Sequence, residues 1–429
     1  MSGSILLRRA LTAAVVLRLT FHALYLPAFE GPDEPQHLAR ALDFARRPFS
    51  SAFRGARVDA DVVAATLTFP CPGRSVGCPP YSQVPGAFDL LRAPPPPAPA
   101  AAGARAILNV EANQPPLYYA LAGLVLRGIG IANDPARALL ALRLLNACLV
   151  LVAVLGPLRR VARHRPAGFA VAGLLALLAP GASEALVRCS NDAVVFLWSA
   201  LVVAAVDRRA STPWIVVLAA AGPLLKMTAF AVVAFAVAAL WSLGRRAGAA
   251  VATAASCSVF AVQALRGWRW GGTLELNLPG GAVAESPAGW LVGLVRSAYA
   301  CVKTTLWLGG WSAFRPPVAL VAAFALLLAV ALGLGFRRRP PSWPLAHAAG
   351  LAVAAAGFFV FAVANRRLYG VWGGVGGWYL WGWAPWLAVS ADDLLAWTRR
   401  QALVVLGAEG ALVAAANALW LVTAQRLYL

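Results

Sequence analysis

Acidic residues are scarce in this chain, with 17 Asp and Glu against 37 Lys and Arg among 429 residues. Charged residues make up 13% of the sequence, whereas soluble domains carry about 25%. Hydrophobic residues make up 60%, above the usual level of about 45–50%. This shortage of charge excludes an ordinary soluble globular protein. The apolar residues instead form many runs near the roughly 20 residues that a bilayer-spanning helix needs, which predicts a polytopic membrane protein.

The positive charge does not indicate nucleic-acid binding, although the net charge is +20. Arginines cluster at the ends of apolar runs, as cytoplasmic loops do under the positive-inside rule. These clusters are Arg8-Arg9, Arg159-Arg160 with Arg163 and Arg165, Arg208-Arg209, Arg245-Arg246, Arg337-Arg338-Arg339 and Arg399-Arg400. We therefore expect the basic residues to set topology, and we expect no nucleic-acid partner.

Cysteine is also scarce, with six residues. Four of them lie in or beside apolar runs, where cysteine acts as a small hydrophobic residue. Cys71 and Cys78 instead bracket a Pro- and Gly-containing turn in a polar segment. They are candidates for a disulfide if this segment faces an oxidising compartment, and the alternative is two unpaired thiols.

The Arg clusters and apolar runs predict an all-α fold with about eleven spans in a single membrane domain, residues 1–429. We expect a retained first helix over residues 5–26, a large external segment over 27–136, and spans over 137–265. A second external segment would cover 266–315, with the C-terminal spans over 316–429. The apolar run 117–131 is an alternative extra span. We find no internal repeat, which disfavours the duplicated halves of many transporters.

The first external segment opens with a predicted amphipathic helix, Glu34–Arg47. Leu38, Ala41, Leu42 and Ala45 share one face, so we expect this helix to lie in the membrane interface. The Pro94–Pro99 tract predicts a semi-rigid linker.

Polar residues that can carry chemistry converge on the predicted external face. They are Asp33, Glu34, His37, Glu111, Gln114, Asn191, Asp192, Lys226, Lys303 and Tyr379. Lys226 and Lys303 are the only lysines in the sequence. Lysine presents a compact charge that meets phosphate oxygens. The plainer interpretation, a snorkelling helix end, is equally open for Lys226 and is favoured for Lys303. We expect two short helices, over 213–224 and 228–243, to meet at a turn at Lys226. Carboxylates beside cations at one membrane face suit a reaction on an anionic, membrane-bound substrate.

Several short motifs, taken in order, resemble the GT-C superfamily of integral-membrane glycosyltransferases. They are Asp33-Glu34, Leu38-Ala39-Arg40, Gln114-Pro115-Pro116-Leu117-Tyr118-Tyr119, Ala141-Leu142-Arg143-Leu144 and Leu225-Lys226-Met227-Thr228. These enzymes, among them protein O-mannosyltransferases and the lipid A aminoarabinose transferase, use polyprenyl-phosphate sugars. The resemblance implies inverting sugar transfer to a glycan, lipid or protein acceptor. It also implies a multi-pass protein of the bacterial inner membrane, in contact with membrane lipids, with a cytoplasmic N-terminus and a periplasmic active site.

By this resemblance Asp33 is the catalytic base and Glu34 its partner, while Lys226 and Arg40 are candidates to hold the lipid phosphate. His37, Glu111, Gln114, Asn191, Asp192, Lys303 and Tyr379 are candidates for substrate binding. No cofactor is implied with certainty, and a divalent metal is possible. One departure concerns the Arg-Tyr pair of many family members, because this chain has Gly377-Trp378-Tyr379 at the corresponding place.

Each residue also has a plainer interpretation. Asp33 and Asn191 are good helix N-caps, and Glu111 is an acid in a first helical turn. For His37 three interpretations stay open: it orients a carboxylate, it binds a metal with Asp33 and Glu34, or it only lies at the interface. The tryptophans of residues 372–386 fit an interfacial aromatic belt better than a sugar-stacking surface. Two other functions stay open, a lipid-linked glycan flippase and a non-catalytic component of an envelope-polysaccharide machine.

Overall fold

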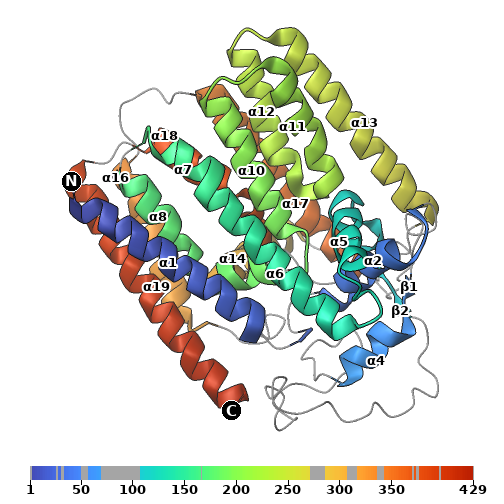
Figure 1. The fold of residues 1–429 in the computed structure, drawn as a ribbon. Helices are drawn as coiled ribbons and strands as arrows, with labels where there is room; N and C mark the ends of the chain where they lie inside the picture. The colour runs from blue at the N-terminus through green and yellow to red at the C-terminus, as the bar shows by residue number, and fades with distance from the viewer. Residues whose placement is uncertain are drawn as a thin grey trace.

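The computed structural model describes residues 2–25, 28–29, 33–49, 57–68, 107–165, 167–270, 286–306, 316–335, 343–369, 372, 376–395 and 398–428. These residues are almost entirely helical (Figure 1). One antiparallel pair of two-residue strands, β1 (Arg57–Val58) and β2 (Ile107–Leu108), closes the long segment between them. The all-α fold class is thus confirmed. The proposed disulfide, Cys71 with Cys78, lies outside the described residues.

The N-terminal half contains the elements that build the candidate site. Its helices are α1 (Ser2–Tyr25), α2 (Glu34–Arg46), α4 (Ala60–Thr68), the 3-10 turn η4 (Val110–Asn113), α5 (Leu117–Gly128), α6 (Pro135–Ala153), the π-turn η5 (Val154–Leu158), α7 (Arg159–Ala162), α8 (Ala167–Leu177), α9 (Pro180–Val187) and α10 (Asp192–Asp207).

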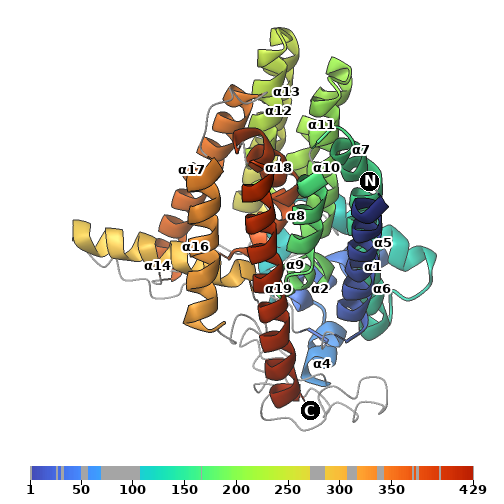
Figure 2. The ribbon, with the colours of Figure 1, turned by 90° about the vertical axis from the view of Figure 1, so that its left-hand side faces the viewer.

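The C-terminal half supplies most of the remaining apolar helices. They are α11 (Thr212–Leu225), the 3-10 turn η6 (Met227–Ala229), α12 (Phe230–Ser242), α13 (Arg246–Trp270), α14 (Pro287–Leu306), α16 (Val318–Gly335), α17 (Pro344–Tyr369), α18 (Trp378–Leu394) and α19 (Arg399–Tyr428). In Figure 2, α14 runs across the direction of α16 and α17.

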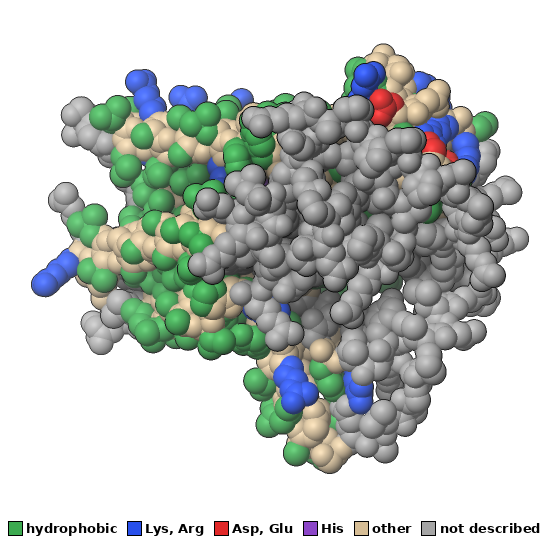
Figure 3. All heavy atoms as spheres, turned by 90° about the horizontal axis from the view of Figure 1, so that it is seen from below, with side chains coloured by type: hydrophobic (Ala, Val, Ile, Leu, Met, Phe, Trp, Pro, Cys, Tyr) green, Lys and Arg blue, Asp and Glu red, His purple; other side chains and the backbone are tan. Residues whose placement is uncertain are grey.

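Within the described ranges, four helical segments are long and apolar enough to cross a membrane. They are Pro135–Ala162, Arg246–Arg266, Pro344–Ala364 and Arg400–Val422. A fifth arises if Phe169–Leu177 and Pro180–Val187, which meet at a bend of 72°, count as one broken span. The structure therefore has the helices of a membrane protein. Seen from below, hydrophobic side chains cover much of the described surface on one flank (Figure 3).

Helices lie in both regions where we expect spans, 137–265 and 316–429, but several of them are shorter than a span. The chain breaks at Lys226 as expected, between α11 and α12, which have 14 and 13 residues. The run 117–131, considered as an extra span, forms the 12-residue helix α5. At 1.5 Å per residue, α5 is about 18 Å long, well below the ~30 Å of a bilayer core.

Helix α2 forms where we expect it, but its surroundings contradict the prediction of an amphipathic interfacial helix. Every residue from Glu34 to Ala45 is buried. Leu38 and Leu42 pack with Tyr118, Tyr119 and other apolar side chains in one core cluster. The protein covers the polar face of α2 as well, since α4, α5, α6 and η4 all contact this helix.

The tryptophans near the C-terminus also differ from expectation. Trp381, Trp383 and Trp386 are buried in the protein core rather than forming an interfacial belt. The indole nitrogens of Trp381 and Trp383 donate hydrogen bonds to the carbonyls of Thr305 (3.2 Å) and Thr228 (3.0 Å). These tryptophans therefore tie α18 to its neighbours.

Close packing of α2 on α5 depends on Gly123, and this contact gives a first prediction. A Cβ atom at Gly123 would lie 2.7–2.8 Å from atoms of Phe44 and Ala45, whereas one at Gly128 meets nothing within 4 Å. Gly123→Ala should destabilise the protein by about 1–3 kcal/mol through overpacking. Gly128→Ala should be neutral or stabilising, because alanine favours helix. Thermal unfolding in detergent compares the two variants, and equal melting temperatures would contradict the packing argument.

Candidate active site

The site is organised around the short loop that joins α9 to α10. Pro180 begins α9 just after the bend, α9 ends at Val187, and Arg188 is its C-cap residue. The Asn146 side-chain amide on α6 donates to the carbonyls of Arg188 (2.6 Å) and Ser190 (3.1 Å). Tyr118 in turn donates its hydroxyl to the Asn146 side-chain oxygen at 3.1 Å. These hydrogen bonds satisfy buried backbone groups and fix the loop against α6.

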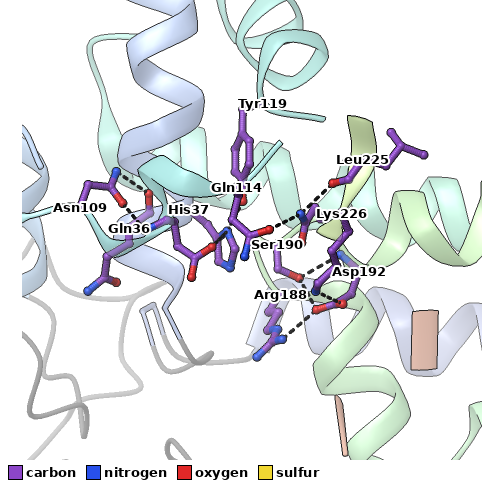
Figure 4. A network of polar contacts seen from close by, with 12 residues as sticks. Gln36, His37, Asn109, Gln114, Tyr119, Arg188, Ser190, Asp192, Leu225 and Lys226 are labelled. Carbon is purple, nitrogen blue, oxygen red and sulfur yellow. Dashed lines mark hydrogen bonds and ion pairs between the residues drawn. The ribbon is translucent and has the colours of Figure 1, made fainter. Parts of the chain in front are cut away.

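Asp192, the first residue of α10, binds two cations. One carboxylate oxygen accepts a hydrogen bond from Arg188 at 2.8 Å, and the other meets the ammonium group of Lys226. Ser190 donates to the same carboxylate at 3.1 Å. Figure 4 shows Arg188 and Lys226 converging on Asp192 from different elements. Asp192 is 1% exposed, so the ion pairs are shielded from water.

The Arg188 guanidinium keeps unused hydrogen-bonding capacity. Its Nε and Nη1 atoms are buried and have no hydrogen-bond partner. The group also lies over the ring of Trp378, 5.6 Å from the ring centre, and the Lys226 ammonium lies 4.9 Å from the ring centre of Tyr379. Because buried donors without partners are costly, these two nitrogens are suited to an anionic ligand.

Asp33 lies at the N-cap position of α2 but does not cap the helix. Its backbone adopts a left-handed conformation with φ 59°, and its side chain makes no capping hydrogen bond. The charges of Arg188 and Lys226 act on this carboxylate and lower its pKa, but burial outweighs them, so the net pKa is raised. The N-cap interpretation therefore does not explain Asp33, whose carboxylate interacts with the cation group instead.

Glu111 is a second acid in the same group. Its Oε2 atom is buried without a hydrogen-bond partner, and the side chain is 12% exposed. Burial, followed by the charge of Asp33, raises the pKa of Glu111 to about 8. Arg266 holds the backbone here, donating to the carbonyls of Ala112 and Gln114 at 2.8 Å each. Two neighbouring carboxyl groups that resist ionising together titrate as a pair.

His37 and the two amides Gln114 and Asn191 border this pair of acids. The Tyr119 hydroxyl is 2.6 Å from His37 Nδ1, and Glu111 Oε2 is 3.7 Å from the same nitrogen. Burial and the charges of Arg188 and Lys226 hold the pKa of His37 well below its usual value, so the ring is neutral. Asn191 also does not cap α10 through its side chain. Its amide donates to the Leu225 carbonyl at 2.9 Å and to Gln114 at 3.4 Å.

Glu34 points away from this group, which corrects its assignment as a catalytic partner of Asp33. Both of its oxygens contact the Arg143 guanidinium on α6, at 2.9 and 2.5 Å, and the Cys189 backbone N–H donates to one of them at 2.8 Å. Glu34 and Arg143 are 0% and 3% exposed. A carboxylate engaged in this way is a structural anchor rather than a base.

Arg40 and Lys303 are not part of the ion pairs at Asp192. Arg40 is fully buried on α2, its guanidinium lies 4.9 Å from the ring centre of Phe44, and the charge of Asp43 acts on it. It is therefore a poor candidate for holding a phosphate beside Asp33. Lys303 is half-buried on α14, whose helix contacts α9 and α18. Tyr379, by contrast, lies beside Lys226.

Metal binding by Asp33, Glu34 and His37 together does not fit this geometry. Glu34 is committed to Arg143, and across the described ranges no three His, Cys, Asp or Glu side chains gather around one point. A metal requirement stays a prediction, and we build no chemical step on it.

Arg188 is the main residue that sequence reasoning missed. It stands four residues before Asp192, a spacing typical of helical ion pairs, but nothing in the sequence showed that it would be buried.

No family model, curated protein or solved structure matches this chain. The chemistry of the site therefore has to be argued from its own geometry.

The anchoring role of Glu34 gives a second prediction. Glu34→Gln leaves the buried Arg143 guanidinium without its carboxylate partner, which should cost about 3–5 kcal/mol of stability. Arg143→Met should cost a similar amount. The double variant should be more stable than the sum of the two losses, because neither charge is then left alone. Thermal unfolding of all four proteins completes the cycle, and strictly additive losses would contradict a direct pair.

The raised pKa of Glu111 gives a third prediction. The native state keeps a proton on this carboxyl group that the unfolded chain loses above its ordinary pKa of 4.5. The resulting stabilisation is therefore complete below pH 4.5 and is lost as the pH rises to about 8. Glu111→Gln should flatten this part of the profile of melting temperature against pH. Parallel profiles of variant and wild type would show that Glu111 has an ordinary pKa.

Proposed function

We propose that this protein is an inverting glycosyltransferase that moves a sugar from a polyprenyl-phosphate carrier to an acceptor at the external face of the membrane. The observation that carries the proposal is the buried group of Asp33, Glu111, Arg188 and Lys226. It combines acids of raised pKa with cations, one of which has unpaired donors.

The acids supply the proton acceptor that this reaction needs. An acceptor hydroxyl attacks the anomeric carbon, a new carbon–oxygen bond forms, and the hydroxyl proton passes to Asp33. A carboxylate of raised pKa is a stronger base than an ordinary one, which favours this transfer. When Glu111 is ionised, its negative charge raises the pKa of Asp33 further. When Glu111 is protonated, its carboxyl group is a hydrogen-bond donor beside the same substrate.

The cations receive the leaving group. As the bond from the anomeric carbon to the phosphate oxygen breaks, negative charge grows on the lipid phosphate. Arg188 Nε and Nη1 are unpaired, and a guanidinium matches phosphate geometry with parallel hydrogen bonds. Lys226 adds a second charge. Asp192 keeps both cations in place before substrate arrives, which limits reorganisation during the reaction.

The arrangement of the arginine clusters supports the proposed topology. The N-terminus, α7 and the start of α13, which carry or adjoin the arginine clusters, lie at one end of the molecule, and α2 and α4 lie towards the other (Figure 1). Under the positive-inside rule the first end is cytoplasmic. We propose that the remaining apolar helices complete about eleven spans of a bacterial inner-membrane protein, with the site on the periplasmic side.

A transfer assay tests this proposal. The purified protein is incubated with a radiolabelled pool of polyprenyl-phosphate sugars and candidate acceptors. Asp33→Asn should lower the transfer rate by about 10²–10⁴-fold, the usual contribution of a general base. Arg188→Gln should also lower it, because the leaving phosphate loses its donors. Asp61→Asn is the control, since Asp61 pairs with Arg46 on the exposed surface.

Each result separates the proposal from its rivals. Unchanged transfer by folded Asp33→Asn would overturn the assignment of the base. Movement of labelled lipid across proteoliposomes without sugar transfer would favour a flippase. Loss of neither activity in the Asp33 and Lys226 variants would favour a non-catalytic component.

A further inference from the structure

A groove separate from the proposed transfer site opens on the apolar flank of the molecule, between α1, α8 and α19. Both α1 and α19 contact α8, and the views in Figures 1 and 2 place the three helices together. The cavity has a volume of about 560 Å³. This lies within the ~300–1,000 Å³ range of ligand pockets.

The walls of the groove are apolar and reach the membrane-facing surface. Leu17 and Phe21 of α1, Leu175 of α8, and Val413 and Leu421 of α19 line it. Leu17 is 71% exposed and Leu421 is 52% exposed. A hydrocarbon chain lying in the bilayer therefore has direct lateral access to these walls.

One cation, Arg18, stands in this apolar lining. Its Nε donates to Ser183 at 3.2 Å, and the guanidinium lies 4.8 Å from the ring centre of Trp420. The Nη2 atom is buried and has no hydrogen-bond partner. The charge of Glu184 acts on Arg18, and this carboxylate also accepts a hydrogen bond from the Trp420 indole at 2.7 Å. Arg18 thus presents an unsatisfied, charged donor beside a hydrocarbon-lined space, which is costly unless an anion accepts from it.

The depth of Arg18 suits a lipid headgroup. It stands seven residues before Tyr25, the last residue of α1. At 1.5 Å per residue, this places its Cα about 10 Å below the helix end. A long arginine side chain spans part of that distance towards the headgroups. Glu409 on α19 precedes the lining residue Gly410 in the chain. Because successive residues of a helix differ in direction by about 100°, Glu409 is turned away from Gly410 and is not among the residues that line the groove.

We propose that this groove binds one anionic membrane phospholipid, with its phosphate on Arg18 and an acyl chain along α1 and α19. Basic pockets between membrane helices bind anionic headgroups in this way. A phospholipid is favoured because the groove opens sideways to the bilayer, where phospholipids are the most abundant source of a phosphate joined to a hydrocarbon chain. The proposal does not depend on the transfer chemistry, since Asp33, Arg188 and Lys226 do not line this groove.

Native mass spectrometry of the full-length protein tests the proposal. The detergent-purified protein is titrated with dioleoylphosphatidylglycerol or, separately, with the zwitterionic dioleoylphosphatidylcholine. The wild type should retain one phosphatidylglycerol in preference to phosphatidylcholine. Arg18→Gln should weaken this binding by about tenfold or more, as expected for a lost hydrogen bond to a charged group.

Three further variants separate the effect of the Arg18 charge from that of the apolar space. Gly410→Leu should also remove the lipid, because it fills the groove: a Cβ there meets only Leu175, at 4.0 Å, so the change is tolerated sterically. Ala414→Phe is a second filling variant should the first fail to fold. Arg160→Gln is the matched control, because it removes one exposed positive charge on α7, outside the groove.

Three results would overturn the proposal. They are equal binding of phosphatidylcholine, undiminished binding by folded Arg18→Gln, and undiminished binding by the filling variant. Displacement of phosphatidylglycerol by equimolar undecaprenyl phosphate would overturn the choice of a phospholipid. Because the readout is bound lipid rather than sugar transfer, failure here is distinguishable from failure of the proposed enzymatic activity.

Discussion

The buried ion pair between Glu34 and Arg143 joins the three elements on which the site depends. It fastens the first turn of α2 to α6, and the same carboxylate accepts the Cys189 N–H from the loop between α9 and α10. This loop carries Arg188, and Asp33 directly precedes Glu34. A shift of this one carboxylate would therefore move the proposed base and the proposed phosphate ligand relative to each other. Such buried pairs are worth most as devices that fix geometry.

Two adjacent acids take opposite parts because the backbone changes conformation between them. Asp33 has left-handed dihedral angles, whereas Glu34 begins the helix. Their side chains therefore leave the chain in different directions, one towards the cations and the other towards Arg143. A non-glycine residue in this conformation is held at some energetic cost, a feature that gathers at functional sites.

Helix positions were predictable along most of the chain, because apolar runs and their breaks are local properties. The break at Lys226 and the helix beginning at Glu34 are examples. Burial was less predictable. The side of α2 that reads as polar in the sequence is covered by other helices, and Trp386 lies in the core rather than at an interface. Periodicity reports which face of a helix is apolar, but not what covers the other face.

The sequence by itself determined an all-helical chain with apolar helices that could span a membrane, and placed Asp33, Glu111 and Lys226 among its few polar residues. Only the tertiary structure decided how they pair. It brought Arg188 to Asp192 and Lys226, left two Arg188 nitrogens unsatisfied, and turned Glu34 into an anchor. The physical reason is that hydropathy depends on each segment alone. The energy of a buried charge depends instead on partners from distant parts of the chain, which only folding brings within reach.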